Sequence, residues 1–151
     1  MVGEPERMQG DAFSDQVNVA ARLESLTRFY GVSLVISENT LAHLSHPEQY
    51  QLRFLDKVIV KGRQEPISIF EVLDAETELM RDLKWQTQPN FERGLDHYRY
   101  QEFAFAKMYF ERVLAVNSED KTALLYLERV DQLLDRGVPE NWSGVWALTQ
   151  K

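Results

Sequence analysis

The stretch YQLRFLDKVIVKGRQEPISIFEVL, residues 50–73, decides the fold of the first half of the chain. Its first part alternates between apolar and polar side chains with the period of a strand. The predicted apolar face contains Leu52, Phe54, Val58 and Val60, and the predicted basic face contains Arg53, Lys57 and Lys61. The short turn KGRQEP leads into a second strand, ISIFEVL, and so short a connection predicts an antiparallel β-hairpin.

A helix and a further strand precede this hairpin in the sequence. The helix is predicted over residues 15–30, with an apolar stripe at helical spacing, and Gly31 ends it. In VSLVIS the alternation of Val32, Leu34 and Ile36 predicts a strand that turns these three side chains toward the core.

A short helix links this strand to the hairpin, with Ser37 or Asn39 as its cap. The order helix, strand, short helix, hairpin indicates the fold class α+β. We expect part of a ferredoxin-like antiparallel sheet, an incomplete one, with helices packed on it.

The second half of the chain is helical in pattern, and the turn NSED, residues 117–120, is predicted to cap a helix over residues 121–134. In residues 88–137, Gly94 and Ala106 allow two antiparallel helices to pack closely while Phe110 fills the groove between them. This spacing resembles one tetratricopeptide repeat followed by the first helix of a second, although the usual tryptophan is absent and Ser118 stands where proline is common. The predicted segments are a sheet domain, a linker helix, the tetratricopeptide-like helices and a tail, over residues 1–74, 75–87, 88–137 and 138–151.

The composition excludes several classes of protein. A net charge of −7 argues against a general surface for nucleic acid or anionic membranes. With no cysteine there is no disulfide and no thiolate metal site, which fits a reducing cytoplasm. The first ten residues lack the apolar core of a signal peptide, and no apolar run approaches the roughly 18 residues of a membrane helix. We therefore expect a cytoplasmic protein without a membrane segment.

Asn18 and Arg22 lie four residues apart on one side of the predicted first helix. The planar guanidinium suits phosphate oxygens, and the amide offers both a donor and an acceptor. Near a helix N-terminus such a pair can hold a polyphosphate or a ribose. Spacing alone favours the plainer interpretation, a solvated polar pair on an exposed helix face.

Other candidates for chemistry have plainer interpretations. His43 and His46 are three residues apart, with no third metal ligand near them in the sequence, and are expected to be surface histidines. The apolar residues of FAFAKMYF, residues 103–110, are expected to form helix core. The tail segment ENWSGVWALTQK, residues 140–151, holds two tryptophans and is expected to dock on the helices.

The stretch DAFSDQVNVAARLESLTRFYGVSLVIS, residues 11–37, resembles the second half of a class III adenylate/guanylate cyclase catalytic domain. It contains the V-N-x-A-x-R-L-E core, then Y-G and an apolar strand ending in S-E. FLDKVIVKGRQEPISIFEVL resembles the hairpin that follows in that family, including the V-K-G turn and the E-P before the last strand. The resemblance covers residues 1 to about 74, and a helical extension after it also occurs in some bacterial members.

The resemblance implies roles for four residues. Asn18 and Arg22 match the catalytic pair that orients the ribose and meets the charge that develops on the phosphates. Lys61 matches the lysine that contacts the terminal phosphates. Asp11 falls where the family places a purine-reading residue, and its carboxylate can accept from the amino group of adenine. A match to ATP is therefore implied, although QGDAFSD departs from the family's commoner sequence there.

The resemblance also implies what this sequence lacks. The family holds two metal ions, Mg²⁺ or Mn²⁺, through two aspartates of the first half of the domain, and no matching segment is present here. Its active site lies between two catalytic domains. We expect a truncated adenylate cyclase whose parent reaction converts ATP to cyclic AMP and pyrophosphate, which dimerises with another cyclase domain, and which is inactive alone. The alternative is a non-catalytic interaction module that works through its helical half.

Overall fold

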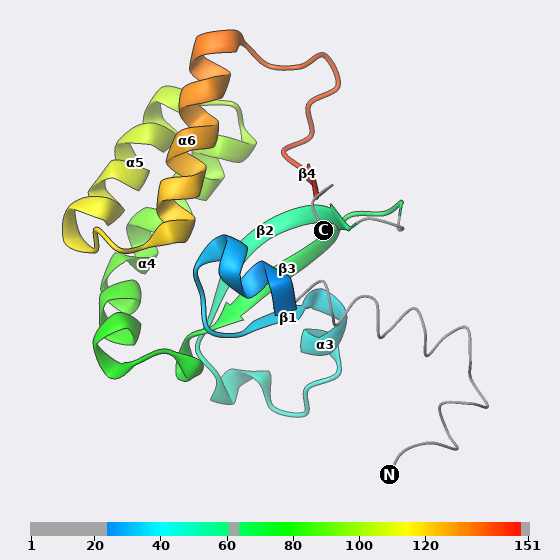
Figure 1. Cartoon of the computed structure of the whole chain (residues 1–151), viewed down its shortest axis with the longest axis vertical. Coiled ribbons are helices and arrows are strands. Elements are labelled where there is room, and N and C mark those ends of the chain that lie inside the picture. Colours follow the sequence, from blue (N-terminus) through cyan, green and yellow to red (C-terminus); the bar gives the residue numbers. More distant parts are fainter. Residues whose placement is uncertain (1–23, 61–63, 149–151) are drawn as a thin grey trace.

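The computed structural model describes residues 24–60 and 64–148, and its strands and helices form an α+β fold, as the sequence predicts (Figure 1). Residues 24–30 are helical and precede the first strand. The remaining elements, in chain order, are β1 (Val35–Ser37), α3 (Glu38–Ala42), the 3-10 turn η1 (Pro47–Gln49), β2 (Leu52–Val60), β3 (Ile67–Val72), the 3-10 turn η2 (Leu73–Ala75), α4 (Glu78–Arg99), α5 (Phe103–Val116), α6 (Lys121–Arg136) and β4 (Trp146–Leu148).

The sheet of the described residues has the strand order β1-β3-β2-β4. β2 and β3 form the predicted antiparallel hairpin, and β1 joins β3 in antiparallel fashion on its other side. β4 belongs to the C-terminal tail and pairs with β2 in parallel, with Val58 opposite Trp146. The sequence did not predict this fourth strand, because three residues are too few to show a periodic pattern.

A bulge in β2 overturns the predicted faces of that strand. The pairing of β2 with β3 shifts between Phe54 and Asp56, which places Leu55 as an extra residue and reverses the alternation beyond it. Leu55 and Val58 are both fully buried, whereas Phe54 is only half-buried. The prediction that Arg53 lies on an exposed basic face is wrong, because its side chain is buried against two carboxylates. Lys57 is exposed, as predicted.

The predicted phase of the strand before α3 is also wrong at Leu34. Val35 and Ser37 are buried and Leu34 is 43% exposed, so the core face of β1 is the one opposite to that expected. Val32 is buried but lies outside the strand. Each face of VSLVIS contains one valine, so the alternation alone does not decide which face is buried. The packing of the helical residues 24–30 decides it.

The predicted helix boundaries are confirmed at three places. Gly31 ends the first helix with a φ of 69°, in the left-handed region that favours glycine. The Ser37 side chain accepts from the amide of Thr40 and caps α3. Asp120, in the predicted turn NSED, accepts from the amide of Ala123 and caps α6.

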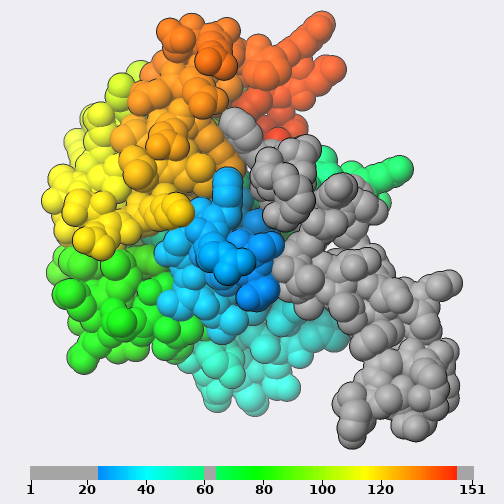
Figure 2. Space-filling model, in the orientation of Figure 1, coloured from blue at the N-terminus to red at the C-terminus, as the bar shows by residue number. Residues whose placement is uncertain are grey.

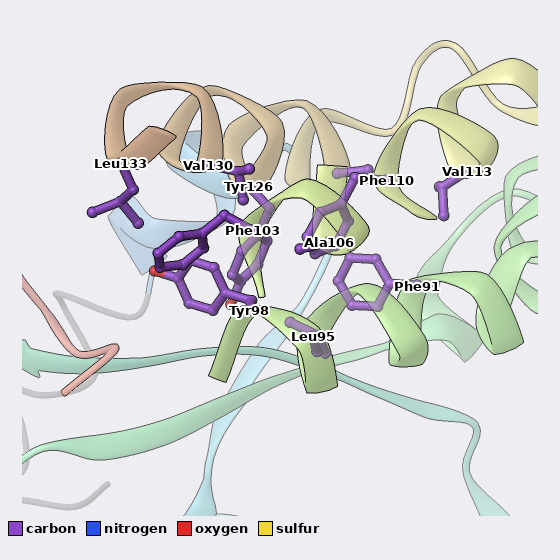
Figure 3. Packing of buried hydrophobic residues seen from close by; sticks show 11 residues of the cluster. Phe91, Leu95, Tyr98, Phe103, Ala106, Phe110, Val113, Tyr126, Val130 and Leu133 are labelled. Carbon is purple, nitrogen blue, oxygen red and sulfur yellow. The ribbon is translucent and has the colours of Figure 1, made fainter. Parts of the chain in front are cut away.

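The three long helices pack side by side, α4 against α5 and α5 against α6 (Figure 1). α4 is one continuous helix across residue 87, where the predicted linker ends. A Cβ built on Gly94 lies 2.8 Å from the ring of Phe110, which confirms the predicted close approach of α4 and α5 at the glycine. Figure 3 shows the Phe110 ring among the buried side chains of all three helices. Phe105 departs from the expected helix core, because it is 56% exposed.

The helices are fixed directly onto the sheet unit. Figure 2 shows the segment after residue 24 seated against the start of α6. There the Thr122 hydroxyl donates to the carbonyl of Tyr30, and the Lys121 ammonium donates to the carbonyl of Arg28. Trp142, in the tail, packs edge-on against Tyr98 and Phe103, as the docked tail predicts.

Candidate functional site

The four predicted site residues, Asp11, Asn18, Arg22 and Lys61, lie outside the described residues, so their roles stay predictions. The structure does describe the elements that border them in the sequence. The helical segment 24–30 follows Arg22, and strand β2 ends one residue before Lys61. The contacts between these two elements are described below.

A buried carboxylate, Asp56, connects the helical segment to β2 and to α6. Its Oδ2 atom accepts from the Tyr30 hydroxyl at 2.6 Å and lies 2.7 Å from the Arg129 guanidinium. Its Oδ1 atom accepts from the amide of Lys57 at 2.9 Å and lies 3.2 Å from the Tyr126 hydroxyl, whose shorter hydrogen bond goes to the carbonyl of Leu55. Asp56 lies in the bulge of β2, so the bulge supplies the acceptor that holds three elements together.

This cluster is built to keep its tyrosines neutral and its arginine charged. Burial, reinforced by the negative charge of Asp56, raises the pKa of Tyr30 and of Tyr126 well above the usual range. Burial alone would lower the pKa of Arg129, but the attraction of Asp56 outweighs it and raises that pKa. The neutral Tyr30 phenol donates to Asp56 and the charged Arg129 guanidinium pairs with it, so the cluster joins the helical segment and α6 to β2.

A second buried network surrounds Arg53. Its Nε donates to Glu71 on β3 at 2.6 Å, and its Nη1 donates to Asp120 at the start of α6 at 2.7 Å. Lys84 of α4 lies 2.8 Å from the same Glu71 carboxylate and 3.3 Å from Glu76. Burial would raise the pKa of Asp120, but the charge and hydrogen bonds of Arg53 outweigh it and lower that pKa. These charges are paired, and together they bind the sheet to α4 and α6.

Neither network was predicted from the sequence. The alternating pattern of the strand groups Arg53 with the solvent-facing lysines. Its burial results from the bulge and from the carboxylates on β3 and at the start of α6. A usable signal was present, however. Asp56, Glu71 and Asp120 are carboxylates within or beside segments whose other residues are mostly apolar, and such residues rarely lie buried without a partner.

The described residues contain no group of three or more histidine, cysteine or acidic side chains placed to hold a metal ion. The Nδ1 atom of His43 lies 2.8 Å from the carbonyl of Asn39, and His46 is exposed beside Glu48. This agrees with the prediction of surface histidines. Across residues 24–60 and 64–148, no helix is both long and apolar enough to cross a membrane.

Comparison with known proteins identifies relatives of this chain. Residues 1–73 match the family described as the adenylate and guanylate cyclase catalytic domain. The chain is 33% identical over 133 residues to "Adenylate cyclase, terminal-differentiation specific" of Dictyostelium discoideum, covering 87% of this chain and 6% of that protein. It is 46% identical over 72 residues to an adenylate cyclase of Anabaena cylindrica, covering 47% of this chain and 14% of that protein.

A third relative, "Adenylate cyclase 1" of Rhizobium meliloti (strain 1021), is 38% identical over 72 residues, which is 48% of this chain and 10% of that protein. The chain thus spans between 6% and 14% of the length of the curated relatives it matches. The Dictyostelium match is longer than the 73 residues of the family match, so it includes part of the helical half. No solved structure matches.

Proposed function

Because residues 1–73 belong to the adenylate and guanylate cyclase catalytic domain family, we propose that this chain supplies the nucleotide-contacting half of an adenylate cyclase site. The reaction is the conversion of ATP to cyclic AMP and pyrophosphate. The observation that carries the proposal is the family match, to which the three relatives, all named adenylate cyclases, add the preference for ATP.

Four residues act in this proposal. Asn18 orients the ribose, and Arg22 donates to the phosphate oxygens on which negative charge grows as pyrophosphate leaves. Lys61 contacts the terminal phosphates. Asp11 accepts from the exocyclic amine of adenine and disfavours guanine, which presents a carbonyl oxygen at that position.

The described scaffold supports a common placement for three of these residues. The Tyr30 hydroxyl, in the helical segment that follows Asn18 and Arg22 in sequence, donates to Asp56 in the strand that precedes Lys61. The contact is buried, and Arg129 and Tyr126 hold the same carboxylate from α6. A helix and a strand fixed to each other in this way offer a rigid base for a site that draws on both.

The metal-binding half of the site belongs, in this proposal, to a second cyclase catalytic domain. Mg²⁺ or Mn²⁺ bound by that domain's aspartates activates the 3'-hydroxyl and neutralises the triphosphate. A polypeptide of these 151 residues is therefore expected to be inactive alone and active as one member of a heterodimer.

A complementation assay tests this proposal. The partner is a class III cyclase domain with its metal aspartates intact and its own asparagine and arginine replaced by alanine, so that it is inactive by itself. The purified chain and this partner, each inactive alone, are expected to form cyclic AMP from ATP when mixed. No activity from a mixture that forms a stable complex contradicts the proposal.

The alternative is an interaction module that works through the helical half, in which tetratricopeptide-like packing remains a prediction. The observation in its favour is that the Dictyostelium match continues into this half. A pull-down separates the two functions. The interaction module is favoured if partner binding requires residues 88–137 and is unchanged by Asn18→Ala and by Arg22→Ala. The mixture of chain and partner should then show no cyclase activity.

A further inference from the structure

A cavity of about 320 Å³ lies where the hairpin, the helices and the C-terminal tail meet. The hairpin contributes Phe54, Lys57 and Ser68, the helices contribute Tyr98 and Arg99, and the tail contributes Ser143 and Gly144. Figure 1 shows how the tail reaches it: after α6 the chain returns to the sheet, where β4 lies beside β2. The packing of Trp142 on Tyr98 and Phe103 holds this wall in place.

The cavity combines an apolar body with a basic mouth. The guanidinium carbon of Arg99 lies 4.9 Å from the centre of the Phe54 ring, so the ring and the cation form one continuous surface. Lys57 is exposed, and none of the ion pairs between described residues involves it. Arg99 has only a long contact of 3.4 Å to Asp96, and both side chains are about half exposed or more.

Among the described residues that line the cavity, the one acidic residue, Asp56, does not oppose an anion. Asp56 is 1% exposed, and its carboxylate is matched by Arg129 at 2.7 Å and by the hydroxyls of Tyr30 and Tyr126. Its charge is therefore already balanced within the protein. Lys57 and Arg99 give the mouth a positive charge in a chain whose net charge is −7.

We propose that this cavity binds a small organic anion, with a phosphate or carboxylate group between Lys57 and Arg99 and an apolar or aromatic body against Phe54 and Tyr98. Arginine and lysine at a partly enclosed site favour such groups through charge-assisted hydrogen bonds. A volume of about 320 Å³ is at the lower limit for ligand pockets, so the ligand has about one ring and is smaller than a nucleoside triphosphate. The proposal uses none of the four residues of the proposed cyclase half-site and does not depend on that function.

A bound ligand would contact three parts of the chain at once. Because the lining comes from the hairpin, the helices and the tail, binding is possible only when the tail is docked and the helices are seated on the sheet. A ligand that binds only this arrangement raises the melting temperature, and above the dissociation constant the stabilisation grows with the logarithm of the ligand concentration.

An NMR titration of the whole chain with phenyl phosphate tests the site, with benzoate, inorganic phosphate and uncharged benzyl alcohol as comparison ligands. We expect saturable shifts of the Ser68, Ser143 and Gly144 amides, with a dissociation constant below about 1 mM. Lys57→Gln and Arg99→Gln should each weaken binding about tenfold. Lys107→Gln, which removes a partly exposed cation that does not line the cavity, should leave the binding unchanged.

The comparison ligands and the variants also give the results that would contradict the proposal. Tighter binding of phenyl phosphate than of benzoate identifies a phosphate ligand, and the reverse identifies a carboxylate. The proposal is overturned if these amides show no saturable shift up to about 10 mM, if benzyl alcohol binds equally well, or if Lys57→Gln and Arg99→Gln bind like the unaltered chain. Spectra of both variants without ligand establish that they are folded, and Lys57 is exposed, so its replacement leaves the core intact.

Discussion

Arg53 and Asp120 are 67 residues apart in the chain, and the Arg53 Nη1 atom donates to the Asp120 carboxylate at 2.7 Å, with both side chains fully buried. The same carboxylate caps α6 by accepting from the amide of Ala123. One acidic side chain therefore both begins a helix and fixes that helix to strand β2. This contact explains why the cyclase-like half and the helical half pack as one body.

Replacement of Asp120 should be costly because two functions are lost together. Asp120→Ala leaves Arg53 with an uncompensated buried charge and removes the cap, and we expect a loss of about 3–5 kcal/mol in the free energy of unfolding. Asp120→Asn keeps a capping oxygen and should lose less. Urea denaturation measures both, with Thr77→Ala, the exposed cap of α4, as a control expected to cost about 1 kcal/mol. Equal costs for Asp120→Ala and Thr77→Ala would show that the ion pair adds nothing.

The same carboxylate should make stability depend on acid pH. The pKa of Asp120 is lower in the folded protein than in the unfolded chain, so its contribution is present above the unfolded value of about 3.9 and is lost as the pH falls through the folded value. The free energy of unfolding should therefore decrease below about pH 4, and less steeply in Asp120→Asn. Asp82→Asn, at an exposed carboxylate, serves as the control. Identical slopes in Asp120→Asn and the unaltered chain would contradict this assignment.

The buried tyrosines should make the fold sensitive to alkali. The pKa values of Tyr30 and Tyr126 are raised in the folded protein, so their stabilising effect is complete below the unfolded value of about 10 and is lost as the pH rises toward the folded values. Ultraviolet titration should show these two phenols ionising only as the protein unfolds. Tyr126→Phe should also cost about 1–3 kcal/mol, because its hydroxyl donates to the buried carbonyl of Leu55. Tyr100→Phe, at a residue 78% exposed, should change neither property.

The contact between Gly94 and Phe110 predicts intolerance to a single methyl group. In Gly94→Ala the new Cβ would lie 2.8 Å from a ring that is itself buried between Phe91 and Tyr126, so the ring has little room to move. We expect a loss of about 1–3 kcal/mol, measured by urea denaturation. In a chain that already carries Phe110→Leu, Gly94→Ala should lower the free energy of unfolding by less than it does beside phenylalanine. A double-mutant cycle with no coupling between the two positions would refute the close packing.

The parts of the fold that local chemistry specifies could be predicted from the sequence. Gly31, Ser37 and Asp120 mark helix ends through backbone conformation or capping oxygens, and each acts where it was expected. The hairpin followed from two strand patterns joined by a short turn. These signals depend on neighbouring residues only.

The parts that depend on distant packing could not be predicted. The bulge at Phe54 and Asp56 changes which residues of β2 face inward, and Arg53 is buried because carboxylates arrive from β3 and α6. Leu34 is exposed because the first helix packs on the other face of β1. For the candidate site, the catalytic roles came from resemblance alone, and Asn18, Arg22 and Lys61 stay predictions because they lie outside the described residues.

The proposed function requires that Arg22 act on the phosphates of ATP in a site shared with a second cyclase domain. The most direct test is the rate of cyclic AMP formation by the complementing mixture, with Arg22→Ala compared with Arg28→Ala, an exposed arginine in the helical segment 24–30. We predict that Arg22→Ala lowers the rate about 100-fold at unchanged complex formation, as loss of one donor to developing charge does, and that Arg28→Ala leaves it unchanged. An equal rate for Arg22→Ala and the unaltered chain would contradict the claim.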